Sequence, residues 1–211
     1  MFMQEIKETT AYRKALRERI LETSISLFSH HGIKAVKMDD IASHLGISKR
    51  TLYEVYKDKE TLLFECIKVF DARKRQHLEA YADGHDVIDI LLETYRMKVS
   101  EVRSFCPLFY EDILKYPELV EYIKKNNARM REGFTRFLRR GIGEGYFRPT
   151  LDFDMVHHLF EALGQYIIVN KLFNQYTLKE LFVNLYLTPL RGLCTRAGVR
   201  RLDECDLELG E

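Results

Sequence analysis

The chain has 211 residues, of which 46% are hydrophobic and 31% are charged, and its formal net charge is +1. This composition argues against a disordered chain, and the near-zero charge excludes a nucleic-acid binder that is basic over its whole surface. We find no apolar run of the ~18–20 residues that a membrane-spanning helix needs, and no secretory signal. We therefore expect a cytoplasmic protein without membrane contact.

The four cysteines do not form a recognisable metal or disulfide pattern. None stands in a C-x-x-C pair, and their spacings match no zinc-binding arrangement. In a reducing compartment such cysteines remain free thiols. We expect this state for Cys66, Cys106, Cys194 and Cys205.

The sequence predicts an all-α fold of about nine helices, because only 4 prolines and 11 glycines interrupt it. Apolar residues from Leu16 to Phe28 recur at helical spacing, and Gly32 can end that helix. Asp83-Gly84 is a turn signal, and Pro189 is expected to kink the last long helix because it lacks an N–H. The tail after Gly198 is expected to fray. The later helices are predicted over residues 39–45, 49–56, 60–82, 87–103, 107–117, 118–141, 155–174 and 177–196.

Residues 20 to 63 carry the most informative pattern, which is that of a helix-turn-helix. Gly46 permits a tight turn, and Ser48 stands where an N-cap is expected. Apolar residues on both sides of this turn can pack against Leu27 and Phe28, which fixes the angle of helix 49–56. That packing leaves polar side chains on the outer face of this helix, which is narrow enough to enter a DNA major groove.

The charge distribution agrees weakly with this interpretation. Residues 1–60 have a net charge of +2, and residues 61–211 have a net charge of −1. Lysines alone are as typical of an ordinary solvated face. Here, however, basic residues bracket the expected reading helix, at Lys37, Lys49, Arg50, Lys57 and Lys59.

The segment from Ile20 to Leu63 resembles the DNA-binding domain of TetR-type transcriptional regulators. The resemblance covers about a fifth of the chain and rests on Leu27-Phe28, Gly32, Asp40-Ile41-Ala42, Gly46-Ile47-Ser48-Lys49, Thr51-Leu52-Tyr53, Lys59-Glu60 and Leu62-Leu63. It implies a homodimer that inserts two reading helices into a palindromic operator in double-stranded DNA. It also implies a DNA-binding domain over residues 1–60 and a helical effector-binding and dimerisation domain over 61–211.

The resemblance also implies a set of DNA contacts. Several positions depart from the family pattern. Lys37 stands where Ser or Thr usually caps the second helix, and Arg50 replaces a small residue. Tyr56 stands in place of the usual Phe, and Thr23-Ser24 in place of an alanine pair. Arg50 could read a guanine through two hydrogen bonds. The expected contact residues are Lys37, Ser48, Lys49, Arg50, Thr51, Tyr53 and Lys59, with Lys59 on a phosphate.

Two further expectations concern the C-terminal domain. A pocket between its helices should be mainly apolar, although aromatic residues at helical spacing are as typical of a core. The expected lining residues are Tyr95, Phe109, Tyr110, Met130, Phe134 and Phe137. The last two helices are expected to form a four-helix bundle with a second copy. Their expected contact residues are Phe160, Leu163, Gly164, Ile167 and Ile168 on one helix, and Leu181, Leu185 and Leu190 on the other.

These features favour a repressor that a small-molecule effector releases from its operator. A helical protein-binding adaptor and an effector-independent regulator remain alternatives. We expect no enzyme and no cofactor, because we find neither a nucleophile–base pair nor a phosphate-binding glycine loop. We also expect no metal: His157 and Glu161 are one turn apart and could share an ion, but the adjacent His157 and His158 are not expected to face it together.

Overall fold

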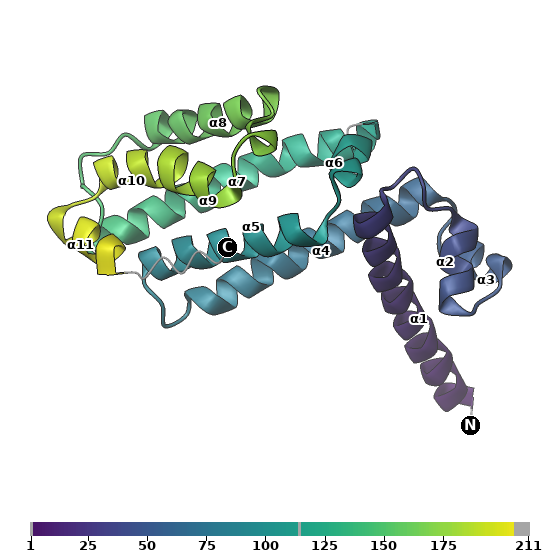
Figure 1. The fold of residues 1–211 in the computed structure, drawn as a ribbon. Coiled ribbons are helices and arrows are strands. Elements are labelled where there is room, and N and C mark those ends of the chain that lie inside the picture. The colour runs from purple at the N-terminus through teal and green to yellow at the C-terminus, as the bar shows by residue number, and fades with distance from the viewer. Residues whose placement is uncertain (1, 114, 205–211) are drawn as a thin grey trace. The chain divides into compact units, whose positions relative to one another are not determined.

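The computed structural model describes residues 2–113 and 115–204, and within these ranges it is built from helices without a named strand (Figure 1). The expected all-α fold is confirmed. The chain forms two compact units. Unit 1 comprises residues 1–76 and 101–124, and unit 2 comprises residues 77–100 and 125–211. Three long helices, α4 (Lys59–Ala82), α5 (Val87–Ser104) and α7 (Pro117–Gly143), contribute residues to both.

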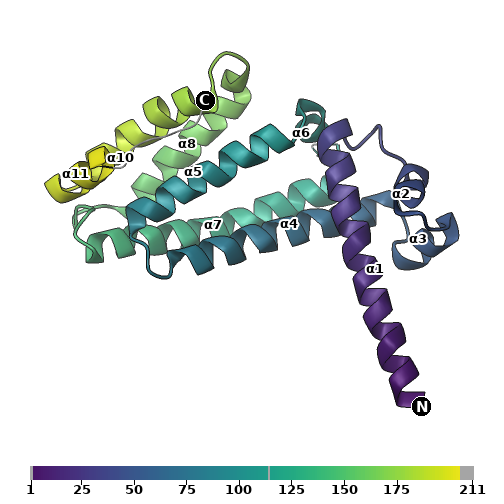
Figure 2. The same cartoon turned by 60° about the horizontal axis from the view of Figure 1, so that its bottom comes forward.

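Unit 1 contains the helix-turn-helix. Its own helices are α1 (Phe2–His31), α2 (Met38–Leu45), α3 (Lys49–Val55) and α6 (Pro107–Ile113). Helix α1 begins well before the predicted start near Leu16, and its N-terminal half extends beyond α2 and α3 (Figure 2). Phe28, Ile41 and Leu52 are fully buried in the core of this unit, so α1, α2 and α3 share one apolar centre as expected.

The predicted turn and cap between α2 and α3 are confirmed. Gly46 has a φ of +66°, in the left-handed region that favours glycine. The Ser48 hydroxyl accepts the Thr51 N–H at 3.0 Å. At the start of α2, Lys37 has no acceptor in its side chain, but the Asp40 carboxylate accepts the Lys37 N–H at 2.7 Å. One half of a capping box thus replaces the usual Ser or Thr cap.

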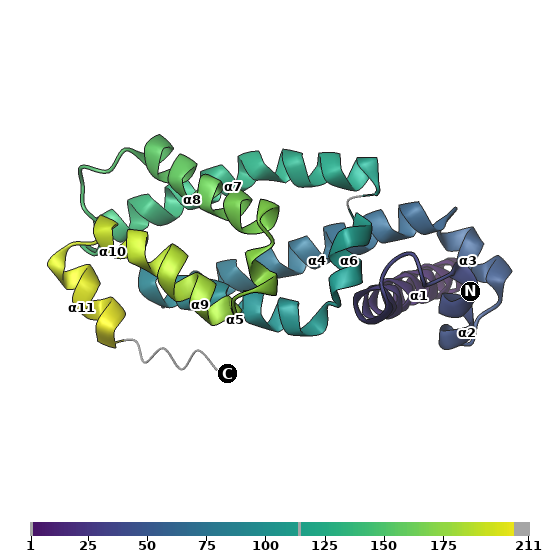
Figure 3. The same ribbon diagram turned by 45° about the horizontal axis from the view of Figure 1, so that its top comes forward.

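Unit 2 contains α8 (Phe153–Val169), α9 (Leu178–Leu181), α10 (Thr188–Leu193) and α11 (Arg196–Glu204), together with parts of α4, α5 and α7. A π-helical segment, Phe182–Leu187, joins α9 to α10, and this continuous helix runs alongside α8 (Figure 3). The core of unit 2 is separate from that of unit 1. Its buried members include Val87, Ile88, Leu138, Phe147 and Leu190.

Two predicted helices differ in detail from the structure. The helix predicted over 155–174 ends at Val169, because Lys171 takes a φ of +50° and a short 3-10 turn, Leu172–Asn174, follows. Near Pro189, the chain accommodates the missing N–H by widening into the π-helical segment, in which the Thr188 hydroxyl donates to the Val183 carbonyl at 3.2 Å.

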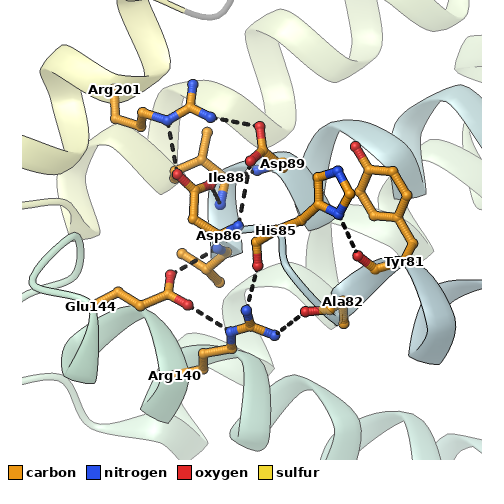
Figure 4. Close-up of polar contacts among 10 residues, drawn as sticks. Tyr81, Ala82, His85, Asp86, Ile88, Asp89, Arg140, Glu144 and Arg201 are labelled. Carbon is orange, nitrogen blue, oxygen red and sulfur yellow. Dashed lines mark hydrogen bonds and ion pairs between the residues drawn. The ribbon is translucent and has the colours of Figure 1, made fainter.

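The expectation that the tail frays after Gly198 is wrong for residues up to 204, which form α11. Leu202 is buried, and a Cβ at Gly198 would overlap the main-chain oxygen of Tyr146. Arg201 donates to Asp86 at 2.8 Å and to Asp89 at 2.6 Å, which ties α11 to the start of α5 (Figure 4). This attachment joins residues more than a hundred positions apart, so no local pattern indicates it.

Figure 4 shows two further groups of hydrogen bonds around the start of α5. Asp86 caps the helix as predicted, because its carboxylate accepts the N–H groups of Ile88 and Asp89, both at 2.9 Å. On the other side, Glu144 accepts the Val87 N–H at 2.8 Å, and Arg140 donates to the carbonyl oxygen of Ala82 at 3.0 Å. Among the described residues, no helix is long and apolar enough to cross a membrane.

Candidate nucleic-acid interface

Helix α3 presents one polar face and buries the other. Leu52 is fully buried, and Tyr56 at the end of the helix is buried beside Arg17, whose Nε donates to the Tyr56 hydroxyl at 3.1 Å. Lys49, Arg50 and Tyr53 are exposed, with 48% of Tyr53 accessible. The outward face expected from the sequence is therefore present, and its angle is fixed by the buried residues beneath it.

The two cations of α3 are paired within unit 1. The Lys49 ammonium contacts Asp39 at 2.5 Å, and this hydrogen bond raises the pKa of Lys49. Arg50 contacts Glu54 one turn later at 2.9 Å. Both pairs are largely solvent-exposed, and exposed ion pairs contribute little to stability because water and salt screen them. A phosphate or a base edge can therefore replace either carboxylate at little cost.

The remaining expected contacts lie at the helix starts. Ser48 is exposed and half-buried Thr51 lies 2.8 Å from it, hydroxyl to hydroxyl, so these two groups turn toward each other at the first turn of α3. Lys37 is exposed at the N-cap of α2. Together with Lys49 and Arg50, these residues combine N-terminal helix ends with positive charge, an arrangement that favours phosphate oxygens.

The side chain of Lys59 forms hydrogen bonds within unit 1. Its ammonium donates to the carbonyl oxygens of Ile33 at 2.7 Å and Val36 at 2.8 Å, both in the loop between α1 and α2. Partial burial lowers the pKa of Lys59. An ammonium has three N–H donors, so one remains for a phosphate. The sequence predicted the phosphate contact but carried no signal for this clamp on the loop.

Asp112 of α6 holds the same loop from another side. Its buried carboxylate accepts the N–H of Lys34 at 2.7 Å and the ammonium of Lys115 at 2.7 Å. These hydrogen bonds lower the pKa of Asp112. The N–H of Cys106 also donates to the Ser29 carbonyl at 2.7 Å. The loop clamp, as we call Lys59 and Asp112 on residues 32–37, was missed by sequence reasoning because Asp112 is 78 positions from Lys34.

The six residues expected to line an effector pocket are divided between the units. Phe109 is buried in the core of unit 1 against Phe105, and Tyr110 lies beside it with its hydroxyl 3.4 Å from Glu101. Met130 on α7 is 69% exposed. Tyr95, Phe134 and Phe137 belong to unit 2, where Phe134 and Phe137 stack with ring centroids 6.2 Å apart.

In unit 2 the rings form a continuous row. Tyr95 packs on Phe182 at 4.1 Å between centroids, Phe182 on Tyr186 at 6.5 Å, Tyr186 on Phe160 at 6.1 Å, and Phe160 on Phe134 at 5.6 Å. We call these five residues the aromatic row. It links α5, the π-helical segment, α8 and α7. Its two ends, Tyr95 and Phe134, were predicted as effector contacts. Phe160 was expected at the dimer interface instead, and the positions of Phe182 and Tyr186 depend on how the helices pack.

The described residues of the expected dimer face of α8 are half-buried and contact the π-helical segment of the same protomer. Phe160 stacks on Tyr186, and a Cβ at Gly164 would lie 3.5 Å from the Tyr186 hydroxyl, so this face packs within unit 2. The side chain of Ile168 lies outside the described set. A different apolar stripe of α8 is exposed, because helical spacing places it on the opposite side. Its large members are Met155, Leu159, Tyr166 and Val169.

The expectation that adjacent histidines cannot face one ligand position is also wrong. The Nδ1 atom of His157 lies 3.8 Å from the Glu161 carboxylate, and that of His158 lies 3.7 Å from the same oxygen. Glu161 is four residues after one histidine and three after the other, so its long side chain stands between them.

The thiols within the described residues are free, at Cys66, Cys106 and Cys194, as expected, whereas Cys205 lies outside those residues. Burial raises the pKa of Cys66 to about 12 and that of Cys194 to about 11. Both thiols are therefore protonated at neutral pH and unreactive.

Comparison with known proteins supports the assignment of α3. Residues 20–66 match the family model described as bacterial regulatory proteins, tetR family. The repressor KstR2 of Mycobacterium tuberculosis is 27% identical over 147 residues, which span 67% of this chain and 74% of KstR2. The solved KstR2 structure matches with a TM-score of 0.52 at 23% identity, over 85% of this chain and 95% of that one.

A second solved structure shares the fold. It is a transcriptional regulator from Saccharomonospora viridis in complex with choline, with a TM-score of 0.67 at 20% identity. The match covers 87% of this chain and all of that one. A buried scaffold that presents α3, together with these relatives, defines a helix-turn-helix DNA-binding transcriptional regulator. Residues 20–66 thus match the DNA-binding domain of the TetR family, and the chain is similar to repressors of that family over about two thirds of its length.

Proposed function

We propose that this protein is a homodimeric repressor, active in the cytoplasm, that binds a palindromic operator and leaves it when a small-molecule effector binds. Residues 1–60 bind DNA in this proposal, and residues 61–211 bind the effector and dimerise. The exposed face of α3 carries the proposal, because its buried Leu52 fixes the outward direction of Lys49, Arg50 and Tyr53.

Seven residues divide the DNA contacts by their chemistry. Arg50 reads a base edge, since a guanidinium can form two parallel hydrogen bonds to guanine. The Tyr53 hydroxyl and the third N–H of Lys59 contact phosphates. Thr51 contacts a base or the backbone from the first turn of α3. The other phosphate contacts come from the helix starts, at Lys37, Ser48 and Lys49.

A second copy of the chain covers the exposed stripe of α8. Met155, Leu159, Tyr166 and Val169 follow one another at intervals of four, seven and three residues, which places them on one side of the helix, and an exposed apolar stripe of this kind marks an interaction site. A two-fold axis pairs the same stripe on both subunits. The helix from α9 to α10, which packs against α8, completes a four-helix bundle.

The effector site lies along the aromatic row. Rings from four elements offer flat apolar surface, and the half-buried Tyr186 has a pKa raised by burial, which leaves its hydroxyl as a neutral hydrogen-bonding group. The relative KstR2 is described as a ketosteroid regulator, and the Saccharomonospora viridis regulator binds choline. An apolar effector with one polar group fits this lining better than a highly charged one.

The loop clamp supplies a route from effector to DNA. Asp112 lies on α6, and the loop that it holds leads directly into α2. An effector that favours a different position of α6 would pull on the loop and turn the reading helices. It can shift this equilibrium only by its differential affinity for the two positions.

The decisive experiment combines sequence selection with salt titration. Full-length protein selects bound duplexes from a random pool, and fluorescence anisotropy then measures affinity for the winner between about 50 and 200 mM salt. A phosphate-contacting dimer loses about 10³–10⁵-fold in affinity over this range and selects an inverted repeat. No enrichment and no salt dependence would instead support the adaptor. Selection of an operator that no apolar compound releases would support the effector-independent regulator.

A further inference from the structure

The first half of α8 gathers three metal-ligating groups. Within the described part of the chain, His157, His158 and Glu161 are the one group of three such side chains whose ligand atoms all lie within 4.8 Å of one another. They flank the exposed stripe of α8. His157 is half-buried, while His158 and Glu161 are exposed, so the group opens to solvent.

The three groups converge without bonding to one another. The Nδ1 atoms of the two histidines lie 3.8 and 3.7 Å from Oε2 of Glu161, too far for hydrogen bonds. Nδ1 of His157 is buried and has no hydrogen-bond partner. A buried polar atom without a hydrogen-bond partner is uncommon and calls for an explanation. One explanation is that the atom serves as a ligand for a metal ion.

The spacing suits a tetrahedral ion. Bonds of about 2.0–2.1 Å to nitrogen and oxygen place neighbouring ligand atoms roughly 3.3–3.4 Å apart in a tetrahedral site. The two separations between a histidine nitrogen and the Glu161 oxygen exceed this value by a few tenths of an ångström, and the ligand atoms of the two histidines lie within 4.8 Å of each other. Side-chain rotations that bring the three atoms closer would complete the site. Three protein ligands leave the fourth position for water.

The charges around the group favour a cation of moderate hardness. Glu161 supplies one negative charge. The neighbouring Asp154 is paired with Arg131 at 2.5 Å, so the charges of Asp154 and Arg131 largely cancel. Two imidazoles with one carboxylate are typical ligands for zinc, cobalt and nickel rather than for calcium or magnesium, which prefer oxygen alone.

We propose that His157, His158 and Glu161 form a binding site for one divalent transition-metal ion per protomer. The site is independent of the DNA-binding proposal, because every one of its groups lies on α8. A metal bound here would connect His157 and His158 to Glu161, one turn later on α8, beside the exposed stripe.

Cobalt(II) titration tests the site in full-length protein that carries no histidine tag and has been dialysed against chelator. One equivalent of cobalt should bind with the visible absorption of a tetrahedral complex, and zinc should displace it. The exposed positions give variants that leave the fold intact. His158→Ala and Glu161→Gln should each weaken cobalt binding by more than the roughly 10–100-fold typical of losing an outer-sphere partner.

Two further variants complete the design. His157→Phe keeps a ring against Phe134, whose centroid is 6.1 Å from that of His157, and should abolish the absorption. The matched control replaces the other adjacent pair, His30 and His31, with alanine; there His30 Nδ1 already contacts the Ser26 carbonyl at 2.7 Å, so cobalt binding should not change. Absence of saturable binding, or equal affinity in wild type, His158→Ala and Glu161→Gln, would overturn the proposal.

Discussion

Unit 1 and unit 2 differ in how their functional groups are specified. In unit 1, the exposed residues of α3 lie opposite a buried leucine and follow a hydroxyl cap and a left-handed glycine, all within a few positions of one another. In unit 2, the aromatic row and the histidine group depend on packing or on side-chain rotation. The turn, the cap and the exposed face of α3 are thus specified by nearby residues, whereas the aromatic row is a product of tertiary structure.

This difference explains why the family model matches residues 20–66 and no later segment. A helix that must enter a groove of fixed width constrains its turn, its cap and its buried residues together. A pocket can be lined by any apolar side chain of suitable volume. Four substitutions in unit 1 test its buried support, its loop clamp and its exposed face, from the largest expected effect to the smallest.

Leu52→Ala tests the buried support of α3. Because Leu52 is fully buried, its truncation should lower the free energy of unfolding by about 2–5 kcal/mol and weaken operator binding as α3 loosens. Denaturant unfolding and anisotropy measure the two effects. The matched control is Tyr53→Ala, which should reduce DNA binding at unchanged stability; similar unfolding curves for both variants would contradict a rigid reading helix.

Asp112→Asn tests the loop clamp. The amide can still accept the Lys34 N–H but loses its charge-assisted bond to Lys115, so the unfolding free energy at pH 7 should fall by about 1–3 kcal/mol. Because folding lowers the pKa of Asp112, the carboxylate stabilises the fold above its unfolded pKa of about 3.9.

That contribution disappears as the pH falls through the lowered folded pKa. The gap between wild type and Asp112→Asn should therefore be constant above about pH 4 and should close below it. Thermal unfolding across this range measures the gap. A difference that persists at the acid end would assign the effect to packing instead of charge.

Arg50→Ala separates base reading from backbone contact. If the guanidinium reads a guanine, preference at one operator position should relax by about 1–3 kcal/mol while other positions keep theirs. Affinities for a set of single-base operator variants measure this change. Lys57→Ala, also exposed, serves as the control. Equal losses on every sequence would make Arg50 a phosphate contact.

Lys59→Ala should have the smallest effect on binding and the most informative one. Loss of the clamp on Ile33 and Val36 should lower stability by about 1 kcal/mol per hydrogen bond. If the third N–H also meets a phosphate, the slope of log affinity against log salt should flatten by about one. An unchanged slope with reduced stability would leave Lys59 as a clamp alone.

Sequence reasoning succeeded where the cause is local. The Ser48 cap and the Asp86 cap, with the turn at Gly46, each need only a few neighbouring residues, and all three are confirmed. The outward face of α3 was also predictable, since helical spacing separates Leu52 from Arg50 and Tyr53.

The other features could not be predicted because they depend on contacts between residues far apart in the sequence. The clamp by Asp112 joins residues 78 positions apart, and Arg201 joins residues 112 and 115 positions apart. The inward direction of Gly164 follows from a neighbour, Tyr186, that belongs to another helix. The sequence placed Glu161 one turn after His157, but the histidine group was dismissed because two adjacent histidines on a helix were not expected to face one ion.

The π-helical segment between α9 and α10 has an evolutionary consequence. Such a segment fits one extra residue into the space of an α-helical turn. Deleting a single residue there would restore an ordinary helix and leave Leu181 before it and Leu190 after it facing the same core as now. Elsewhere in the long helices, the same deletion would rotate everything downstream by about 100°. The chain can therefore change length at this point without repacking its interior.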